Sequence, residues 1–327
     1  MKVKKVLVSA FLLATCLMNV QAQRRNEIQV PDLDGYTTLK CDFHMHTVFS
    51  DGLVWPTVRV DEAYREGLDA ISLTEHIEYR PHKKDVVADH NRSFDLCQKQ
   101  AEKLGILLIR GSEITRPMAP GHFNAIFLAD SNPLEQKEYK DAFNEAKKQG
   151  AFIFWNHPGW AAQQPDTTKW WPAHTELYNE GCMHGIEVAN GPLYMPEAVQ
   201  WCLDKNLTMI GTSDIHQPIQ TDYDFSKDEH RTMTFVFAKE RSLKGIREAL
   251  DNRRTAAQSV HIQRVMRQVK TTQLCILDSL LQFLILELDN LTALRTDLVV
   301  MRIMVIAFFV LGRVPELMFD NQTGIDK

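Results

Sequence analysis

Two histidines and a carboxylate stand close together near the start of this chain, in the stretch CDFHMHTVFSDG. His44 and His46 are one residue apart, and Asp51 follows a few residues later. On a β-strand, residues i and i+2 point to the same face, about 6.6 Å apart. Two imidazoles placed in this way can bind one metal ion, and imidazole with carboxylate suits zinc, manganese or iron. The pair alone is weak support for a metal site, because polar surface residues can have the same spacing.

Residues of the same chemical types recur at the ends of other apolar, strand-like stretches. They are His76, Glu113, His122, His157, Asp214 and His216. Taken singly, each has an ordinary structural explanation, such as a histidine in a turn or a carboxylate that caps a helix. Their repetition at strand ends instead favours one shared metal site. Glu75 directly precedes His76 and is expected to face away from the site, where it could support the ligands indirectly.

The elements that must position these residues alternate between strands and helices. This alternation favours parallel βα units, and seven or eight units in about 215 residues favour a closed barrel. The carboxyl ends of the strands in such a barrel meet at one face, so distant candidate ligands would converge there. Strands are predicted at 38–44, 69–76, 105–113, 123–129, 151–158, 185–190, 207–214 and 232–238, and helices at 56–67, 92–105, 135–150, 196–206 and 242–254.

Composition limits the classes of partner. The chain has 327 residues, 44% of them hydrophobic, and a formal net charge of −5. This is an ordinary globular composition without the basic surface that a long nucleic acid requires. The cysteines beyond Cys16 are odd in number and form no CxxC motif, so neither a disulfide framework nor a thiolate zinc site is predicted.

The two ends of the chain differ from its middle. Residues 1–22 have the charged start, apolar run and small residues of a secretory signal peptide, which predicts export to the periplasm or envelope. Lipid attachment at Cys16 is the alternative. The strand–helix rhythm stops near Ala256, and apolar segments follow at 274–291 and 298–312. We expect these to form buried or docking helices, with membrane association as an alternative. The predicted domains are therefore a signal peptide at 1–22, a barrel at 23–256 and a C-terminal extension of unknown role at 257–327.

The order of the candidate ligands resembles that of a known family. HxH, an acid, a strand-end histidine, a glutamate, two separate histidines and a final DxH are similar to the PHP (polymerase and histidinol phosphatase) superfamily, over roughly residues 38–256. The resemblance implies an α/β fold, a distorted (β/α)7 TIM-like barrel, with three divalent metal ions (Zn, Mn or Fe). It assigns His44, His46, Glu113 and Asp214 to the first metal, Glu113 as a bridge with His122 and His157 to the second, and Asp51, His76 and His216 to the third. In several relatives the Asp51 position is another histidine, so the metal preference of the third site could differ.

The resemblance also implies a metal-dependent phosphoesterase. A hydroxide held between two metals would attack a small phosphate mono- or diester, and Glu113 and Asp214 would act as ligands in catalysis. Arg116 is our hypothesis for a residue that clamps the phosphate, because a guanidinium matches phosphate in two-point geometry; the alternative is a surface arginine. The stretches 156–171, with three tryptophans, and 191–197 are expected near the mouth of the site, although such tryptophans often only pack.

Two other readings remain open. A metallohydrolase that acts on amides or lactones would usually need a lysine between its metals, and no lysine stands at a strand end here. A barrel that binds a metal or ligand without turnover would usually have lost some ligands, whereas this chain has the complete set. A nuclease for long DNA is disfavoured by the negative charge, while small nucleotides stay possible substrates.

Overall fold

The computed structural model describes residues 25–227 and 229–260. The predicted signal peptide and the apolar segments 274–291 and 298–312 lie outside the described residues. Among the helices of the described residues, none is both long enough and apolar enough to cross a membrane.

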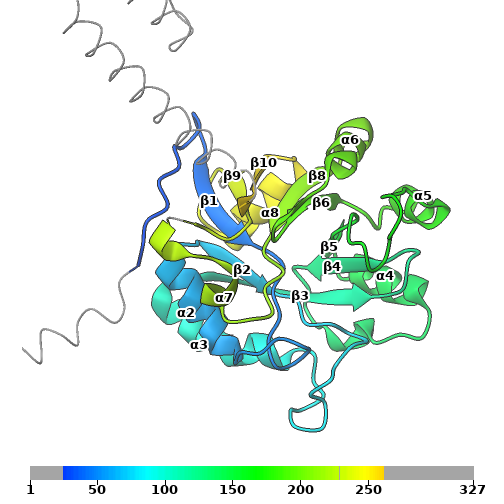
Figure 1. The fold of residues 1–327 in the computed structure, drawn as a ribbon, viewed down its shortest axis with the longest axis horizontal. Helices are drawn as coiled ribbons and strands as arrows, with labels where there is room; N and C mark the ends of the chain where they lie inside the picture. Colours follow the sequence, from blue (N-terminus) through cyan, green and yellow to red (C-terminus); the bar gives the residue numbers. More distant parts are fainter. Residues whose placement is uncertain (1–24, 228, 261–327) are drawn as a thin grey trace, which may run out of the picture. The chain divides into compact units, whose positions relative to one another are not determined.

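One curled sheet forms the centre of the fold, with helices packed around it (Figure 1). Its strand order is β10-β9-β1-β2-β3-β4-β5-β6-β7, and β8 pairs with β6. The TIM-like α/β fold class is therefore confirmed. The strands are β1 (Thr37–Asp42), β2 (Ala70–Leu73), β3 (Leu107–Thr115), β4 (His122–Ile126), β5 (Phe152–Trp155), β6 (Gly185–Asn190), β7 (Leu193–Tyr194), β8 (Thr208–Thr212), β9 (Met233–Ala238) and β10 (Thr255–Gln258).

The helices begin and end where local chemistry predicts. Proline occupies a first-turn position of α2, α5 and α6, where its missing N–H costs no hydrogen bond. Ser242 caps α8 by accepting a hydrogen bond from the Gly245 N–H at 2.9 Å. The helices are α2 (Pro56–Glu66), α3 (Arg92–Leu104), α4 (Tyr139–Lys148), α5 (Pro172–Asn179), α6 (Pro196–Lys205), α7 (Ile219–Asp222) and α8 (Leu243–Asp251).

Strand direction departs from the expected all-parallel arrangement. β1, β2 and β3 are parallel, but β4 runs antiparallel to both β3 and β5, and β9 runs antiparallel to β1. The prediction of parallel units throughout was therefore wrong for these two strands. The reversal has a functional consequence, because the first residue of β4, His122, pairs with Thr115 at the end of β3. His122 thus lies at the same edge as the residues that follow the parallel strands.

The barrel closes differently at its two ends. At the ligand end, Met45 pairs with Ile215, and the Asp214 N–H donates to the His44 carbonyl at 2.9 Å. Farther from the ligands, the antiparallel pair β9–β10, whose strands are connected through α8, lies between β1 and β8. There the Gly211 N–H donates to the Thr234 hydroxyl at 3.0 Å, and that hydroxyl donates to the Gly211 carbonyl at 2.7 Å. A Cβ on Gly211 would stand 2.7 Å from the Met233 carbonyl, so a glycine is required at this close approach.

Apolar residues fill the barrel and seal the end opposite the ligands. Leu39 of β1, Phe43 directly after β1 and Phe154 of β5 pack in one buried cluster with Ile246 and Leu250 of α8. Arg247 of α8 and Arg241, which lies just before this helix, donate to the carbonyls of Gly150 and Gly105, just before β5 and β3. Helix α8 therefore lies at the end of the barrel where these strands start, and leaves the other end open.

Four elements were not expected from the sequence: α5, α7, β7 and β10. They are short, and α5 follows a tryptophan-rich stretch that we interpreted as a loop. The last barrel strand and helix were expected to end by about Arg254, but β10 begins directly after this residue. Val260, which follows β10, is also buried. The predicted boundary at residue 256 thus falls within β10, while the remainder of the extension lies outside the described residues.

Candidate metal centre

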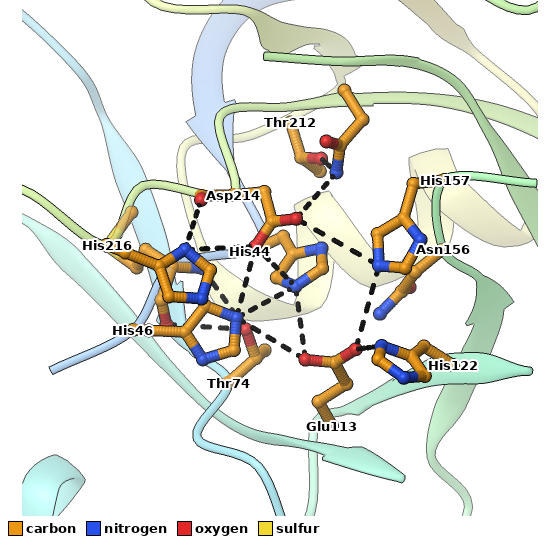
Figure 2. Close-up of polar contacts among 12 residues, drawn as sticks. His44, His46, Thr74, Glu113, His122, Asn156, His157, Thr212, Asp214 and His216 are labelled. Carbon is orange, nitrogen blue, oxygen red and sulfur yellow. Dashed lines mark hydrogen bonds and ion pairs between the residues drawn. The ribbon is translucent and has the colours of Figure 1, made fainter. Parts of the chain in front are cut away.

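All nine candidate ligands converge at the open end of the barrel, and Figure 2 shows most of them around Glu113 and Asp214. We call this set the nine-residue cluster. It consists of His44, His46, Asp51, His76, Glu113, His122, His157, Asp214 and His216.

The two short motifs HMH and DIH lie side by side at the centre of the cluster. Met45 and Ile215 pair with each other and point into the apolar core, so the residues flanking them face the site. The Nε2 atoms of His44 and His46 are 3.0 Å apart, and Asp214 Oδ1 lies 3.1 Å from each of them. Two nitrogens at right angles on a metal, with bonds of about 2.1 Å, are roughly 3.0 Å apart. The spacing therefore suits a shared metal ion.

Glu113 faces two groups of histidines at once. Its Oε2 atom lies 3.4 Å from His44 Nε2 and 3.3 Å from His46 Nε2. Its Oε1 atom lies 2.7 Å from His122 Nδ1 and 3.8 Å from His157 Nε2. A carboxylate with each oxygen directed to a different pair of imidazoles has the geometry of a bridge between two metal positions.

Asp51 lies close to His76 and His216, and also to His46. Its Oδ1 atom is 3.2 Å from His216 Nε2, 3.4 Å from His76 Nε2 and 3.8 Å from His46 Nδ1. The His46 ring stacks between the other two, with centroid distances of 4.3 Å to His76 and 4.2 Å to His216. His76 also lies 2.9 Å from Glu113 Oε2 through its Nδ1 atom. The third group is thus continuous with the first two.

Unpaired buried oxygens show that the cluster fits metal ions. Both carboxylate oxygens of Glu113, Oδ1 of Asp51 and Oδ1 of Asp214 are buried and make no hydrogen bond of normal geometry. A buried carboxylate without a partner is costly in free energy. Divalent cations placed among these oxygens and the imidazole nitrogens would remove that cost, and the mixed donor set suits zinc, manganese or iron.

The same crowding perturbs the acid–base behaviour of the cluster. Burial would raise the pKa of Glu113, but the surrounding His76, His122 and His44 hold that pKa well below its usual range. Burial, together with His76 and His216, lowers the pKa of His46 to about 3. An anionic Glu113 and a neutral His46 are each in the state that binds a metal ion. Against the effect of burial, the neighbouring carboxylates raise the pKa of His44, His76 and His216, so a metal would have to displace protons from these rings.

Glu187 on β6 contacts two members of the cluster, His44 and His157. This residue was not predicted from the sequence. Its Oε1 atom lies 2.8 Å from His44 Nδ1 and accepts from the Thr212 hydroxyl at 2.6 Å. Its Oε2 atom accepts from the His157 N–H at 2.7 Å and from the Asn190 side chain at 2.8 Å. A possible signal was a carboxylate inside GIEVAN, a strand whose residues are all buried.

Glu75 has the indirect role that was expected of it. Its carboxylate accepts from the Thr47 N–H at 3.1 Å and from the hydroxyls of Thr47 and Ser50. The Ser50 oxygen in turn lies 3.2 Å from His46 Nδ1. Glu75 therefore holds the loop that carries His46 and Asp51 without reaching the centre of the cluster.

Two candidate ligands have an unusual backbone. His157 and Asp214 have φ values of 32° and 51°, in the left-handed region that non-glycine residues rarely adopt. Hydrogen bonds hold both residues there, from the His157 N–H to Glu187 and from the Asp214 N–H to His44. Backbone strain of this kind persists where the surroundings over-determine the conformation, as in functional sites.

A cavity of about 790 Å³ opens above the cluster. Trp160, Pro192 and Leu193 line it, so the stretches 156–171 and 191–197 both reach the mouth as expected. Of the three tryptophans in the first stretch, Trp160 alone lines the cavity. Trp170 packs against Trp155 and Trp201 in the interior of the fold.

Arg116 also lines the cavity, but its guanidinium binds protein groups. Nε lies 2.8 Å from Glu78 Oε1, while Nη1 and Nη2 donate to the carbonyls of Lys137 and Gln136 at 2.9 and 2.6 Å. To clamp a phosphate, Arg116 would have to exchange these partners. Its role in catalysis stays a prediction that the observed contacts do not favour.

Comparison with known proteins places the chain in a family. No family model matches it. One solved structure is a two-domain protein from Bacteroides vulgatus that contains a predicted PHP-like metal-dependent phosphoesterase. It is 90% identical to this chain and superposes with a TM-score of 0.72. The match covers 73% of this chain and 69% of the Bacteroides chain. The chain belongs to the PHP-like metal-dependent phosphoesterase family. The nine-residue cluster is the part of this PHP-like chain that can hold divalent metals.

Two further similarities are more distant. A 5'-3' exoribonuclease of Haemophilus influenzae is 35% identical over 78 residues, which is 24% of this PHP-like chain and 24% of the length of that relative. A putative metal-dependent phosphoesterase from Bifidobacterium adolescentis is 17% identical with a TM-score of 0.42, covering 54% of this chain and 87% of its own.

Proposed function

We propose that this chain hydrolyses small phosphate mono- or diesters with the help of three divalent metal ions held by the nine-residue cluster. The observation that carries the proposal is the position of Glu113. Its two oxygens face separate pairs of imidazoles and make no hydrogen bond of normal geometry. A carboxylate in this position could bridge two adjacent metal ions held by the two pairs of imidazoles.

The residues divide into three metal positions. His44, His46, Glu113 and Asp214 would hold the first metal, and Glu113 with His122 and His157 the second. Asp51, His76 and His216 would hold the third, to which His46 lies close through its Nδ1 atom. Bound divalent metals supply charge neutralisation for phosphoryl oxygens and lower the pKa of water toward neutrality.

The protein groups supply orientation and protonation state. Glu187 accepts the Nδ1 proton of His44, which leaves Nε2 free to face the site. Asn190 donates to Asp214 Oδ2 at 3.3 Å and so fixes the carboxylate that lies between the first two groups of ligands. Phosphoryl transfer depends mainly on positioning and charge stabilisation, and a serine or cysteine nucleophile is not required.

The test is hydrolysis of an aryl phosphate monoester and the matching diester by protein loaded with manganese or zinc. Asp214→Asn keeps the side-chain volume but removes the anionic oxygen and should abolish turnover. Asp204→Asn is the matched control, because Asp204 is exposed on α6 and outside the cavity. Metal analysis of the loaded protein should give three ions per chain.

The outcomes separate the alternatives. Turnover that is lost in Asp214→Asn and kept in Asp204→Asn supports the proposal, and the preferred ester distinguishes a monoesterase from a diesterase. No turnover of either ester with three metals bound would reject it in favour of a non-phosphate hydrolase or a binding role. Cleavage of a short RNA in preference to both esters would instead extend to this chain the activity named for the exoribonuclease relative.

A further inference from the structure

The wall of the cavity is largely apolar and aromatic, in contrast to its polar floor. Trp160, Tyr79 and Leu193 are 41%, 54% and 39% exposed, although they are large hydrophobic side chains. All three line the cavity, together with Pro117 and Pro192. Exposed apolar groups around a polar site indicate that the part of the ligand not bound by the polar groups is itself apolar.

Trp160 stands directly beside the proposed second metal position. Its ring centroid lies 5.7 Å from that of His122 and 5.2 Å from that of His157. The backbone holds it firmly, since the Trp160 N–H donates to the His157 carbonyl at 2.9 Å and the Trp160 carbonyl accepts from the Gln164 N–H at 2.9 Å. The main chain of Trp160 is thus held in place, and its indole lies beside both imidazoles at the wall of the cavity.

Positive charge on the wall is already neutralised. Among the described residues that line the cavity, Arg116 is the one lysine or arginine side chain, and its nitrogens bind Glu78 and two carbonyls. A second phosphate group, held away from the metals, would therefore meet no free cation. It would instead face apolar side chains, where burying a charge is unfavourable.

We infer that Trp160 selects phosphate esters whose leaving group carries an uncharged aromatic ring. The inference rests on the proposed phosphoesterase function and specifies its substrate class. The ester phosphate binds at the metals, the ring of the leaving group lies against the indole, and a second phosphate on that ring weakens binding. Trp160 is a specificity-determining residue that takes no part in the bond-breaking step.

The substrates for the test are benzyl phosphate and cyclohexylmethyl phosphate. Both release an alkoxide of similar basicity and equal carbon number, and only the first has an aromatic ring. Stacking on an aromatic side chain predicts that kcat/KM is about tenfold higher for the benzyl ester. Trp160→Ala should remove this preference by slowing the benzyl ester alone, and Trp160→Phe should restore most of it.

Trp171→Ala is the matched control. Trp171 belongs to the same tryptophan-containing stretch and is 37% exposed, but it does not line the cavity. This variant should keep the preference for the benzyl ester. Benzene-1,4-dimethanol bisphosphate, which adds a second phosphate to the ring, should be hydrolysed at least tenfold less efficiently than benzyl phosphate.

Binding of non-hydrolysable phosphonates provides a readout that does not depend on turnover. Calorimetry on the metal-loaded protein should show about tenfold tighter binding of benzylphosphonate than of cyclohexylmethylphosphonate, and Trp160→Ala should equalise them. If both esters are hydrolysed equally well, the phosphoesterase stands and the ring selectivity is overturned. If neither is hydrolysed but the phosphonates differ in the Trp160-dependent way, the ring site stands and the proposed reaction fails. Preference for the bisphosphate would overturn the argument from charge.

Discussion

The Oε1 atom of Glu187 lies 2.8 Å from Nδ1 of His44, although 143 residues separate the two in the chain. Both side chains are fully buried. A carboxylate at this distance accepts a hydrogen bond from the Nδ1–H of the imidazole, which fixes the tautomer and increases the basicity of Nε2 toward a metal. The same carboxylate accepts from the His157 N–H, so Glu187 links the first and second proposed metal positions.

Glu187→Gln should weaken metal binding by about 10- to 100-fold, the usual effect of losing such a supporting carboxylate. The substitution keeps the volume of the side chain, and so the fold should remain. Competition with a chromophoric chelator measures the affinity. Glu197→Gln, at an exposed position in the first turn of α6, should leave the affinity unchanged. Equal affinity in both variants would show that Glu187 does not tune His44.

Removal of metals should lower thermal stability. Without cations, both oxygens of Glu113 and the Oδ1 atoms of Asp51 and Asp214 are buried against histidine rings and make no hydrogen bond of normal geometry. A metal present at about 1,000 times its Kd adds about 4 kcal/mol of stability, which for a domain of this size is on the order of 10 °C in Tm. Scanning calorimetry with manganese and with a chelator tests this. Glu113→Gln should lose most of the increment, and an identical Tm with and without metal would contradict a metal site.

Arg231 forms a buried ion network just behind the cluster. Its Nε lies 2.7 Å from Glu66 Oε2 and its Nη1 3.1 Å from Asp42 Oδ2, and Asp42 also accepts from the Ser213 N–H at 3.2 Å. Arg231→Met leaves two buried carboxylates without their cation and should cost about 3–5 kcal/mol of unfolding free energy. Urea unfolding measures the loss. Lys239→Met, which breaks an exposed ion pair with Glu248 of α8, should cost less than about 1 kcal/mol.

His174 should make stability depend on pH below neutrality. Its Nδ1 accepts from the Trp171 N–H at 3.0 Å and its Nε2 lies 2.7 Å from the Pro120 carbonyl, a pattern that only the neutral ring can satisfy. Burial lowers its pKa from 6.5 to about 4. Between these values the unfolded chain binds more protons than the folded one, so stability falls as the pH decreases through this window.

The expected loss through His174 is on the order of 2 kcal/mol between pH 7 and pH 5. Urea unfolding of the metal-free protein at both values measures it, with His174→Gln as the comparison because glutamine does not titrate. The variant should be less stable at pH 7 but should lose less stability on acidification. A parallel loss in both proteins would assign the pH dependence to other groups.

Much of the fold and of the cluster could be predicted from local sequence patterns. Short apolar runs located the main strands, and proline and glycine marked helix ends such as Pro56 and Gly67. The i, i+2 spacing in HMH identified His44 and His46 as a pair, because a strand presents alternate residues to one face. Asp214 and the other candidates were identified by their repetition at the ends of predicted strands. These features depend on interactions between residues that are close in the chain, and such interactions can be predicted from the sequence.

Other features were decided by the tertiary structure alone. The direction of β4 brings His122 to the ligand edge, although the sequence suggested a parallel strand. The contact of Glu187 with His44, and that of Arg116 with Glu78, depend on which strands and loops become neighbours. Strand order and direction follow from the packing of the whole barrel, and they cannot be predicted from the local pattern of apolar residues. The sequence by itself thus determined which residues could bind metal, and the curled, barrel-like sheet decided how they meet and what supports them.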